Sequence, residues 1–307
     1  METNLELSLK NVLQKQFNGQ ILSVKKIGGG SYGTAFKVET ATSPAIFVAK
    51  VFGPRGMAQK EAAALELLAK KSVIKIPKVF FVIEKSDDFH SDILAMEFIE
   101  GKNAFESFDL LFRPKKEKQA FANALADEIA AIHSETAAKF GPIDNPSFDS
   151  WDDFYRPFAR EVFEKAEKMF SKKQLPAYVF RAMQKAWQNY DKFFDLPVST
   201  PCLIHGDLNV MNVMVKKPFE ITGIIDPLNS MFADGEYDLF QLNNLTGKKF
   251  GLYDTFKSRH QVSKNCDRKC AFYALWNEVY CYQKSGKMFA FIMRPIVKEI
   301  NKQLKML

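Results

Sequence analysis

The residues best suited to chemistry in this chain stand close together between His205 and Asp226. Asp207 stands five residues before Asn212, and Asp226 ends the next apolar run. Phosphoryl transfer needs a carboxylate that orients a substrate hydroxyl, and oxygen ligands for the magnesium ions that bridge the nucleotide phosphates. The spacing indicates this chemistry, with Asp207 in the first role and Asn212 and Asp226 in the second.

Short apolar runs should position these residues. Pro227 stops the last run, because proline cannot continue a sheet ladder, and the three runs cover residues 201–204, 213–215 and 221–225. We expect the strand ends to place the three polar residues at one edge of a small sheet. Each of them alone could be a turn former, but together they favour catalysis. His205, beside the loop, is expected to brace it through backbone hydrogen bonds.

A glycine-rich segment precedes these residues along the chain. Residues 28–33 fit the pattern G-x-G-x-x-G, which alone is a weak signal. A dinucleotide-binding fold needs a helix to begin there, whereas residues 34–40 alternate like a strand. A strand–turn–strand unit can cover nucleotide phosphates with its backbone amides, although a hairpin without a ligand has the same pattern. The predicted nucleotide contacts are Gly28, Gly30, Ser31 and Gly33.

Lys50 lies inside an apolar strand pattern at residues 45–51, where a lysine suggests an open cleft. It would reach the nucleotide phosphates while paired with a carboxylate from the next helix. Glu61 shares the apolar helix face, whereas Glu66 stands four residues before a lysine and suits a solvated pair. We therefore predict that Glu61 is the partner. The alternative is an edge-strand lysine that extends to solvent.

Two more strands are expected at 78–84 and 92–99. The second leads into a predicted hinge, where the backbone of Glu97 and Ile99 would meet the adenine edge. The expected division is therefore an N-terminal nucleotide-binding lobe, a hinge and a C-terminal catalytic lobe, at residues 1–96, 97–101 and 102–307.

Helical periodicity dominates after the hinge. Glu236 and Asp238 should cap a helix that they begin, although Asp234 or Glu236 could instead approach magnesium or a cationic acceptor. The segment 151–153 could border the acceptor pocket or start a helix. His133 should be a packing or capping residue. The expected helices cover residues 118–133, 151–169, 175–194, 271–282 and 288–304, with another from about 236.

With these motifs, the chain resembles the kinase-like small-molecule phosphotransferases, which include aminoglycoside phosphotransferases and choline kinases. The closer resemblance is to the fructosamine-3-kinase (ketosamine kinase) family, and it rests on Glu61–Leu65, Trp151–Tyr155, Asp226-Pro227 and Gly235–Leu239. It implies an α+β, bilobal protein-kinase-like fold: a small antiparallel β-sheet lobe with one helix, and a larger, mainly helical lobe. It also implies ATP and Mg²⁺ as cofactors, with Asp207 as the catalytic base.

Some residues depart from that family pattern. Asn209 stands where family members often carry Trp, and Val210-Met211 replaces a smaller pair, so the acceptor stays open. Ser31 lies where some members carry a Cys, so no redox switch is expected. Gly206 replaces the Arg of protein kinases, and the segment after Asp226 is too short for an activation loop, which argues against a protein substrate.

Composition narrows the partners and the compartment. The net charge is +7, but the basic residues are scattered among acidic ones and form no nucleic-acid motif. No apolar run reaches about 18 residues, so no membrane span is expected, and Met1–Lys10 lacks the apolar core of a secretory signal. The four cysteines lack a paired C-x-x-C spacing, which favours reduced thiols in a cytoplasmic protein.

The sequence therefore predicts ATP- and Mg²⁺-dependent phosphorylation of a small-molecule hydroxyl, with a ketosamine as the leading acceptor. One alternative is an aminoglycoside or choline-type alcohol kinase. Another is a nucleotide-binding protein without transfer activity. The oligomeric state stays open.

Overall fold

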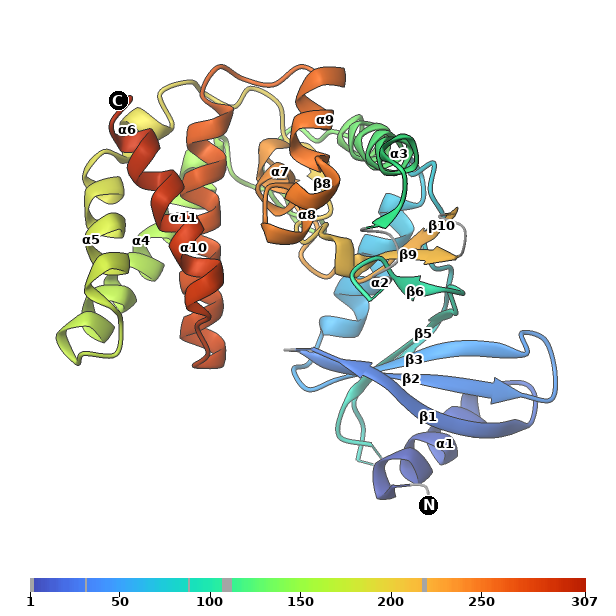
Figure 1. Ribbon diagram of the computed structural model, residues 1–307. Coiled ribbons are helices and arrows are strands. Elements are labelled where there is room, and N and C mark those ends of the chain that lie inside the picture. Colours follow the sequence, from blue (N-terminus) through green and yellow to red (C-terminus); the bar gives the residue numbers. More distant parts are fainter. Residues whose placement is uncertain (1–2, 31, 88, 107–111, 217–219) are drawn as a thin grey trace. The chain divides into compact units, whose positions relative to one another are not determined.

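The computed structural model describes residues 3–30, 32–87, 89–106, 112–216 and 220–307. Its backbone contacts divide the chain into two compact units (Figure 1). The first comprises Met1–Glu106 with Asn212–Leu228, and the second comprises Ser107–Met211 with Asn229–Leu307. The chain therefore enters each unit twice. The predicted hinge at residues 97–101 stays a prediction.

An antiparallel sheet of five strands forms most of the first unit, in the order β1-β2-β3-β5-β4. Its strands are β1 (Ile21–Gly29), β2 (Gly33–Thr40), β3 (Ile46–Phe52), β4 (Val79–Ile83) and β5 (Asp92–Glu97). Strands β2 to β5 lie where the sequence predicted strands, and β1 precedes the glycine-rich segment, where a strand–turn–strand unit was expected. Because β1, β2 and β3 are consecutive and adjacent, the glycine-rich segment becomes the turn of a hairpin.

Two helices pack against this sheet. Helix α2 (Met57–Leu68) contacts β3, β4 and β5. Helix α1 (Asn4–Gln16) begins at a capping box in which Thr3 and Glu6 satisfy each other's backbone amides. Its buried residues Leu9 and Leu13 join the core of the sheet. The prediction included α2 and did not include α1.

A second, three-stranded sheet completes the first unit, in the order β10-β9-β6. Strands β9 (Val213–Lys216) and β10 (Glu220–Ile224) match two of the predicted apolar runs and pair as a hairpin, and β6 (Lys102–Asn103) pairs with β9. This pairing explains why residues 212–228 belong to the first unit although they follow residue 211 of the second.

The expectation of one small sheet for Asp207, Asn212 and Asp226 was wrong. The strand before Asp207 is β8 (Cys202–Ile204), which pairs with β11 (Met231–Ala233) in a separate sheet of the second unit, next to β7 (Gly141–Pro142). Hydropathy predicts that a short run is a strand, but it does not say which strand satisfies its backbone groups. Here β9 pairs with the next strand along the chain, β10, whereas β8 pairs with β11, which is more distant in the sequence.

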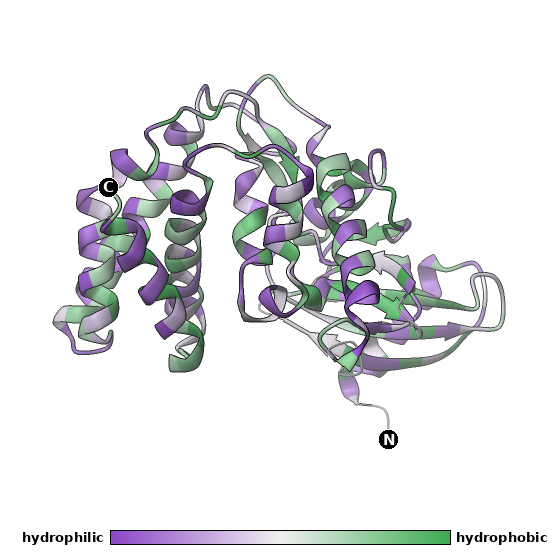
Figure 2. Ribbon diagram, turned by 45° about the horizontal axis from the view of Figure 1, so that its top comes forward, coloured by the Kyte–Doolittle hydropathy of each residue, from purple (hydrophilic) through white to green (hydrophobic). Residues whose placement is uncertain are grey.

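The second unit is mainly helical. Its hydrophobic and hydrophilic residues alternate along the helices, as in amphipathic helices packed around a core (Figure 2). Helix α10 contacts α4, α5, α6, α7 and α11, so it is the central packing element. The helices are α3 (Lys115–His133), α4 (Trp151–Ser171), α5 (Ala177–Gln188), α6 (Tyr190–Phe193), α7 (Glu236–Leu242), α8 (Leu245–Phe250), α9 (Leu252–Arg259), α10 (Cys266–Ser285) and α11 (Ala290–Leu304).

One predicted helix is interrupted. The sequence indicated a single helix over 175–194, but α5 ends at Gln188 and α6 begins at Tyr190. Asn189 between them has φ −112° and ψ 21°, outside helical geometry. The apolar period continues across the break, so the pattern alone does not reveal it. Among the described helices, none contains a stretch that is both long and apolar enough to cross a membrane.

Candidate active site

The hairpin of β9 and β10 brings the two predicted magnesium ligands to one end of a small sheet. Val213 pairs with Ile224, so Asn212 and Asp226 flank the open end of the hairpin. The Ile225 amide donates a hydrogen bond to the Asn212 carbonyl at 3.0 Å, which ties the two segments together. Asp226 has φ 64°, a left-handed backbone that is strained for a residue with a Cβ. Such strain is commonly found at functional sites.

Lys50 connects the sheet to this hairpin within the first unit. Its Nζ lies 2.6 Å from Glu61 Oε2 and 2.6 Å from Asp226 Oδ1. Glu61 is fully buried on α2, whereas Glu66 is exposed, as the helical spacing indicated. One ammonium group therefore bridges two carboxylates that come from different elements. The catalytic roles of these residues stay predictions.

Burial and charge shift the pKa values of this pair. Burial raises the pKa of Glu61 to about 7, and the nearby Lys50 ammonium offsets only part of that effect. Burial alone would lower the pKa of Lys50, but the attraction of Glu61 and Asp226 outweighs it and raises the pKa. Glu61 Oε1 is buried and has no hydrogen-bond partner among the described residues. The ammonium therefore stays charged while it holds both carboxylates.

The turn between β1 and β2 has room beside Gly28 and Gly30 but not beside Gly33. The Gly30 amide donates to the Gly33 carbonyl at 2.8 Å. A Cβ at Gly33 would lie 2.9 Å from the Val51 carbonyl oxygen, so packing excludes a side chain there. A Cβ built on Gly28 or Gly30 meets no described atom within 4 Å, so the chain's own packing does not demand glycine at these positions. Open backbone of this kind fits a nucleotide phosphate chain. Ser31 lies outside the described residues.

The segment predicted to meet adenine begins at the end of β5. The Glu97 amide already donates a hydrogen bond to the Lys78 carbonyl at 2.8 Å. An adenine contact at Glu97 would therefore be made by the Glu97 carbonyl oxygen. Ile99 is buried, and its side chain packs so closely on Gly223 that a Cβ there would lie 2.8 Å from it. The nucleotide roles of Glu97 and Ile99 stay predictions.

The loop that carries Asp207 is built in the second unit. Gly206 has φ 78°, and a Cβ there would lie 2.3 Å from the Asn229 carbonyl oxygen, so only glycine fits. His205 is fully buried, and its Nδ1 accepts a hydrogen bond from the Asp207 amide at 3.3 Å. Its carbonyl accepts one from the Ser230 hydroxyl at 3.3 Å. The predicted bracing role of His205 is confirmed.

Asp238 holds the same loop from α7. Its carboxylate accepts the His205 amide at 3.0 Å and the Gly206 amide at 2.8 Å, and it lies 3.2 Å from His133 Nε2. Burial alone would raise the pKa of Asp238, but these hydrogen bonds and the His133 side chain keep the pKa low. The predicted capping role was wrong, because the N-cap residue of α7 is Gly235 and the carboxylate turns toward the loop instead. His133 is the packing residue that the sequence predicted.

Asp207 itself is contacted by two side-chain amides. Asn209 Nδ2 donates to Asp207 Oδ1 at 3.0 Å, and Gln241 Nε2 donates to the same oxygen at 3.2 Å. Sequence reasoning assigned Asn209 to the acceptor side and missed Gln241. A signal was available, because Gln241 lies three residues after Asp238 and therefore on the same face of α7.

Asp234 and Glu236 belong to a buried network. Lys269 Nζ lies 2.7 Å from Asp234 Oδ2 and 2.9 Å from Glu236 Oε2. The Tyr273 hydroxyl donates to Asp234 at 2.7 Å and accepts the indole N–H of Trp151 at 2.8 Å. Burial alone would lower the pKa of Lys269, but the two carboxylates raise it to about 12. The expectation that Glu236 caps α7 was therefore wrong, since an internal lysine binds the carboxylates of both acidic residues.

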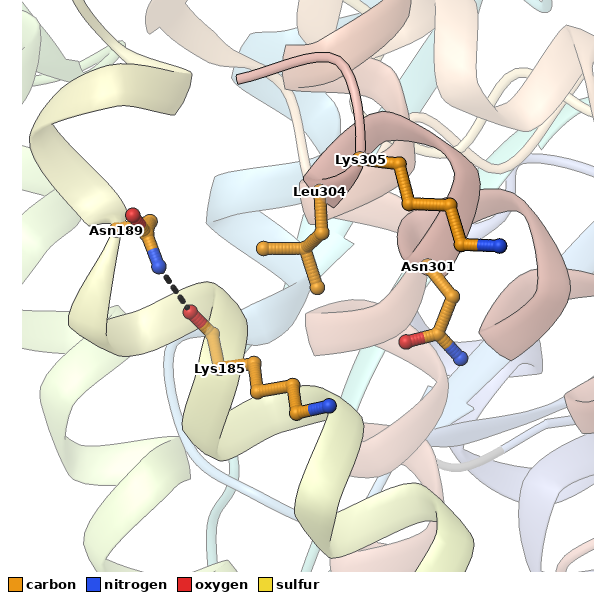
Figure 3. Close-up of a pocket in the computed structure, with 5 residues that line it drawn as sticks. All are labelled: Lys185, Asn189, Asn301, Leu304 and Lys305. Carbon is orange, nitrogen blue, oxygen red and sulfur yellow. Dashed lines mark hydrogen bonds between the residues drawn. The ribbon is translucent and has the colours of Figure 1, made fainter.

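The segment 151–153 starts α4. Trp151 is buried in an aromatic cluster and stacks on Tyr155 with ring centroids 5.2 Å apart. Ser150 caps the helix by accepting the Asp153 amide at 3.0 Å. A surface hollow elsewhere in the second unit lies between α5 and α11 (Figure 3). None of its lining residues is a predicted site residue; they are Lys185, Asn189, Asn301, Leu304 and Lys305.

Known proteins are similar to this chain, one of them in sequence and others in fold. A relative named "Uncharacterized protein YcbJ", from Escherichia coli strain K12, is 20% identical over 247 residues, which cover 80% of this chain and 81% of that protein. The GDP complex of wild-type aminoglycoside 2'-phosphotransferase-IIIa has a TM-score of 0.72 at 18% identity, over 99% of both chains. A structure named "Putative fructosamine-3-kinase", from Haemophilus somnus 129PT, has a TM-score of 0.67 at 16% identity, over 96% of this chain and 97% of that one.

These similarities show the predicted kinase-like α+β fold. The family described as "Phosphotransferase enzyme family" matches residues 23–252, which run from β1 through the glycine turn, Lys50, the Asp207 loop and α7. Because that match covers most of the chain, the protein belongs to the phosphotransferase enzyme family.

Proposed function

We propose that this phosphotransferase transfers the γ-phosphoryl group of ATP to a hydroxyl of a small molecule, with magnesium. The observation that carries the proposal is the contact of Lys50 with both Glu61 and Asp226, at 2.6 Å each. It joins a strand lysine, a buried helix carboxylate and an exposed carboxylate at the end of a hairpin. Phosphoryl transfer relies on such positioned charges rather than on covalent chemistry.

Each residue has a proposed role. Lys50, held by Glu61, would bind the nucleotide phosphates, and the backbone at residues 28–33 would cover them. Asn212 and Asp226 would hold magnesium through hard oxygen ligands, which Mg²⁺ prefers together with phosphates and water. Bound magnesium supplies charge neutralisation. Asp207 would accept the proton of the acceptor hydroxyl as the new O–P bond forms and the bond between the γ-phosphorus and the ADP oxygen breaks.

We propose a ketosamine as the acceptor. The support is the similarity in fold to the structure named "Putative fructosamine-3-kinase", together with the resemblance of Glu61–Leu65, Trp151–Tyr155 and Asp226-Pro227 to that family. Aminoglycosides are the second candidate, because similar structures are named as an aminoglycoside 2'-phosphotransferase and as an aminoglycoside phosphotransferase. A choline-type alcohol is the third. The four cysteines are free thiols, which suits the cytoplasmic location that belongs to this proposal.

The test is ATP consumption with magnesium across a panel of ketosamines, aminoglycosides, choline and simple sugars, with Asp207→Ala as the control. Turnover on a ketosamine that is absent in the variant would support the proposal. Turnover on another acceptor would keep the reaction and replace the substrate. ATP binding without turnover on any acceptor would favour a nucleotide-binding protein without transfer activity.

A further inference from the structure

We propose that Asn209 and Gln241 are positioning residues that clamp the Asp207 carboxylate in the orientation in which it receives the acceptor hydroxyl. This inference rests on the proposed function, which makes Asp207 the group that orients that hydroxyl. It concerns residues that sequence patterns either assigned elsewhere or did not reveal.

The orientation of the Asn209 amide is determined by its neighbours. Its Oδ1 accepts the Met211 backbone amide at 2.8 Å, so its Nδ2 must face the other way. That Nδ2 donates to Asp207 Oδ1 at 3.0 Å and lies 3.3 Å from the Asp207 carbonyl oxygen. A flipped amide would set oxygen against the carboxylate and N–H against N–H. Asn209 therefore acts as a donor to Asp207.

Gln241 reaches the same oxygen from α7. Its Nε2 lies 3.2 Å from Asp207 Oδ1. One turn earlier on the same helix, Asp238 accepts the backbone amides of His205 and Gly206. Helix α7 therefore holds the loop at two levels, with Asp238 on its backbone and Gln241 on the carboxylate.

Two donors on one oxygen have a geometric consequence. A carboxylate oxygen has two lone-pair directions, so the amides of Asn209 and Gln241 engage both directions of Oδ1. This opposes rotation of the carboxylate about its Cβ–Cγ bond. A reacting group that is already oriented does not have to reorganise in the transition state.

The fold of the loop does not depend on the Gln241 amide. Its backbone is already held by Asp238, by the Ser230 hydroxyl and by the tight turn at Gly206. Removing the Gln241 amide should therefore change catalysis more than stability.

The test compares Gln241→Met with Gln283→Met. Both glutamines are half-buried on helices of the second unit, and Gln283 Nε2 donates at 2.8 Å to the Val162 carbonyl, which has no part in the loop. We expect Gln241→Met to lower kcat about 10- to 100-fold with KM for ATP changed less than about twofold, since a small misplacement near the reacting atoms can have that effect. Gln283→Met should leave kcat unchanged.

A double-variant comparison separates positioning from general disruption. In an Asp207→Asn background, adding Gln241→Met should change the residual kcat by less than about twofold, because the clamped carboxylate is already gone. If transfer is abolished in Asp207→Ala but normal in Gln241→Met, the clamp is refuted while the proposed function of Asp207 stands. An equal loss in both backgrounds would also refute the clamp.

Absence of transfer in the unaltered chain would count against the proposed function instead. The side-chain amide signals in nuclear magnetic resonance then decide the inference. We expect the Asn209 and Gln241 signals to shift in Asp207→Ala while that of Gln283 stays in place. Unmoved Asn209 and Gln241 signals would overturn the clamp.

Discussion

At the scale of single residues, the site depends on one ammonium group shared by two carboxylates. Lys50 is mostly buried, Glu61 fully so, and Asp226 is half exposed, with 46% of its side-chain surface accessible. One oxygen of the buried Glu61 carboxylate has no partner among the described residues, and burial of such a group lowers the stability of the fold. The exposed Asp226, by contrast, is open to further ligands. The buried Glu61 is therefore suited to hold Lys50 in place, and the half-exposed Asp226 is suited to bind a metal ion.

Substitution of Asp207 and substitution of Asp226 should impair different steps, phosphoryl transfer and magnesium-dependent ATP binding respectively. We expect Asp207→Ala to keep its affinity for ATP and lose about 10³-fold or more of its transfer rate, because it removes the group that orients the hydroxyl. Asp226→Ala should lose the magnesium-dependent part of ATP binding. Titration calorimetry with and without magnesium, together with a transfer assay, measures both effects. Full transfer in Asp207→Ala would refute its role.

Glu61 should make stability depend on pH. Its folded pKa of about 7 lies above the ordinary value of 4.5, so the folded chain holds an extra proton between these pH values. The contribution of this group is fully present below pH 4.5 and is lost as the pH rises through 7. Glu61→Gln carries no charge, so the stability difference between it and the unaltered chain should change by about 3 kcal/mol over this window.

Urea unfolding of the metal-free protein between pH 4 and pH 8 measures this effect. The control is Glu66→Gln, an exposed carboxylate on the same helix, whose profile should follow that of the unaltered chain. Parallel profiles for Glu61→Gln and the unaltered chain would contradict the prediction.

At the scale of elements, α10 supports the turn that leads into α7. Lys269 and Tyr273 lie one turn apart on α10, and both contact Asp234 at the end of β11. Asp238 and Gln241 of α7 in turn contact the Asp207 loop. A buried ion pair is a weak source of net stability, but removing one partner leaves an uncompensated charge. We infer that this network defines where α7 begins.

Lys269→Met should therefore be strongly destabilising. It leaves Asp234 and Glu236 buried without their cation, so we expect the free energy of unfolding to fall by about 3–5 kcal/mol. The matched control is Lys165→Met on α4, which removes the exposed i,i+4 pair with Glu161 and should change the same quantity by about 0–1 kcal/mol. Chemical denaturation measures both variants, and equal losses would contradict the buried role of Lys269.

At the scale of the whole molecule, the charge distribution bears on nucleotide binding. The chain carries a net charge of +7, and ATP is an anion. Long-range attraction raises association rates and is screened by salt, with a Debye length of about 10 Å at 0.1 M. A positive chain should therefore capture ATP faster at low ionic strength.

We expect the association rate of ATP to fall several-fold, by about 3- to 10-fold, between 20 mM and 500 mM salt, while the dissociation rate changes less. Stopped-flow binding measures both rates. Adenosine, which lacks the phosphates, is the control and should show little salt dependence. The same dependence for adenosine would show that long-range charge is not the cause.

Local patterns in the sequence determined the elements and part of the site. Alternation predicted β2, an apolar run predicted β3, and the glycine segment between two strands was expected to be a hairpin turn rather than the start of a helix. Helical spacing chose Glu61 over Glu66 as the partner of Lys50. These inferences succeed because each one depends on residues within one or two turns of a helix or along one strand.

Only the tertiary structure decided which distant segments meet. It paired β8 with β11 instead of with the hairpin of β9 and β10. It buried Lys269 against Asp234 and brought Gln241 to Asp207 across 34 residues of sequence. Local hydropathy does not predict such contacts. The partner of a buried charge or of an unpaired strand edge is whichever segment packs against it, and that segment can be distant in the sequence. Local sequence patterns therefore predicted the phosphotransferase family and most of the elements, while packing decided how the Asp207 loop is held.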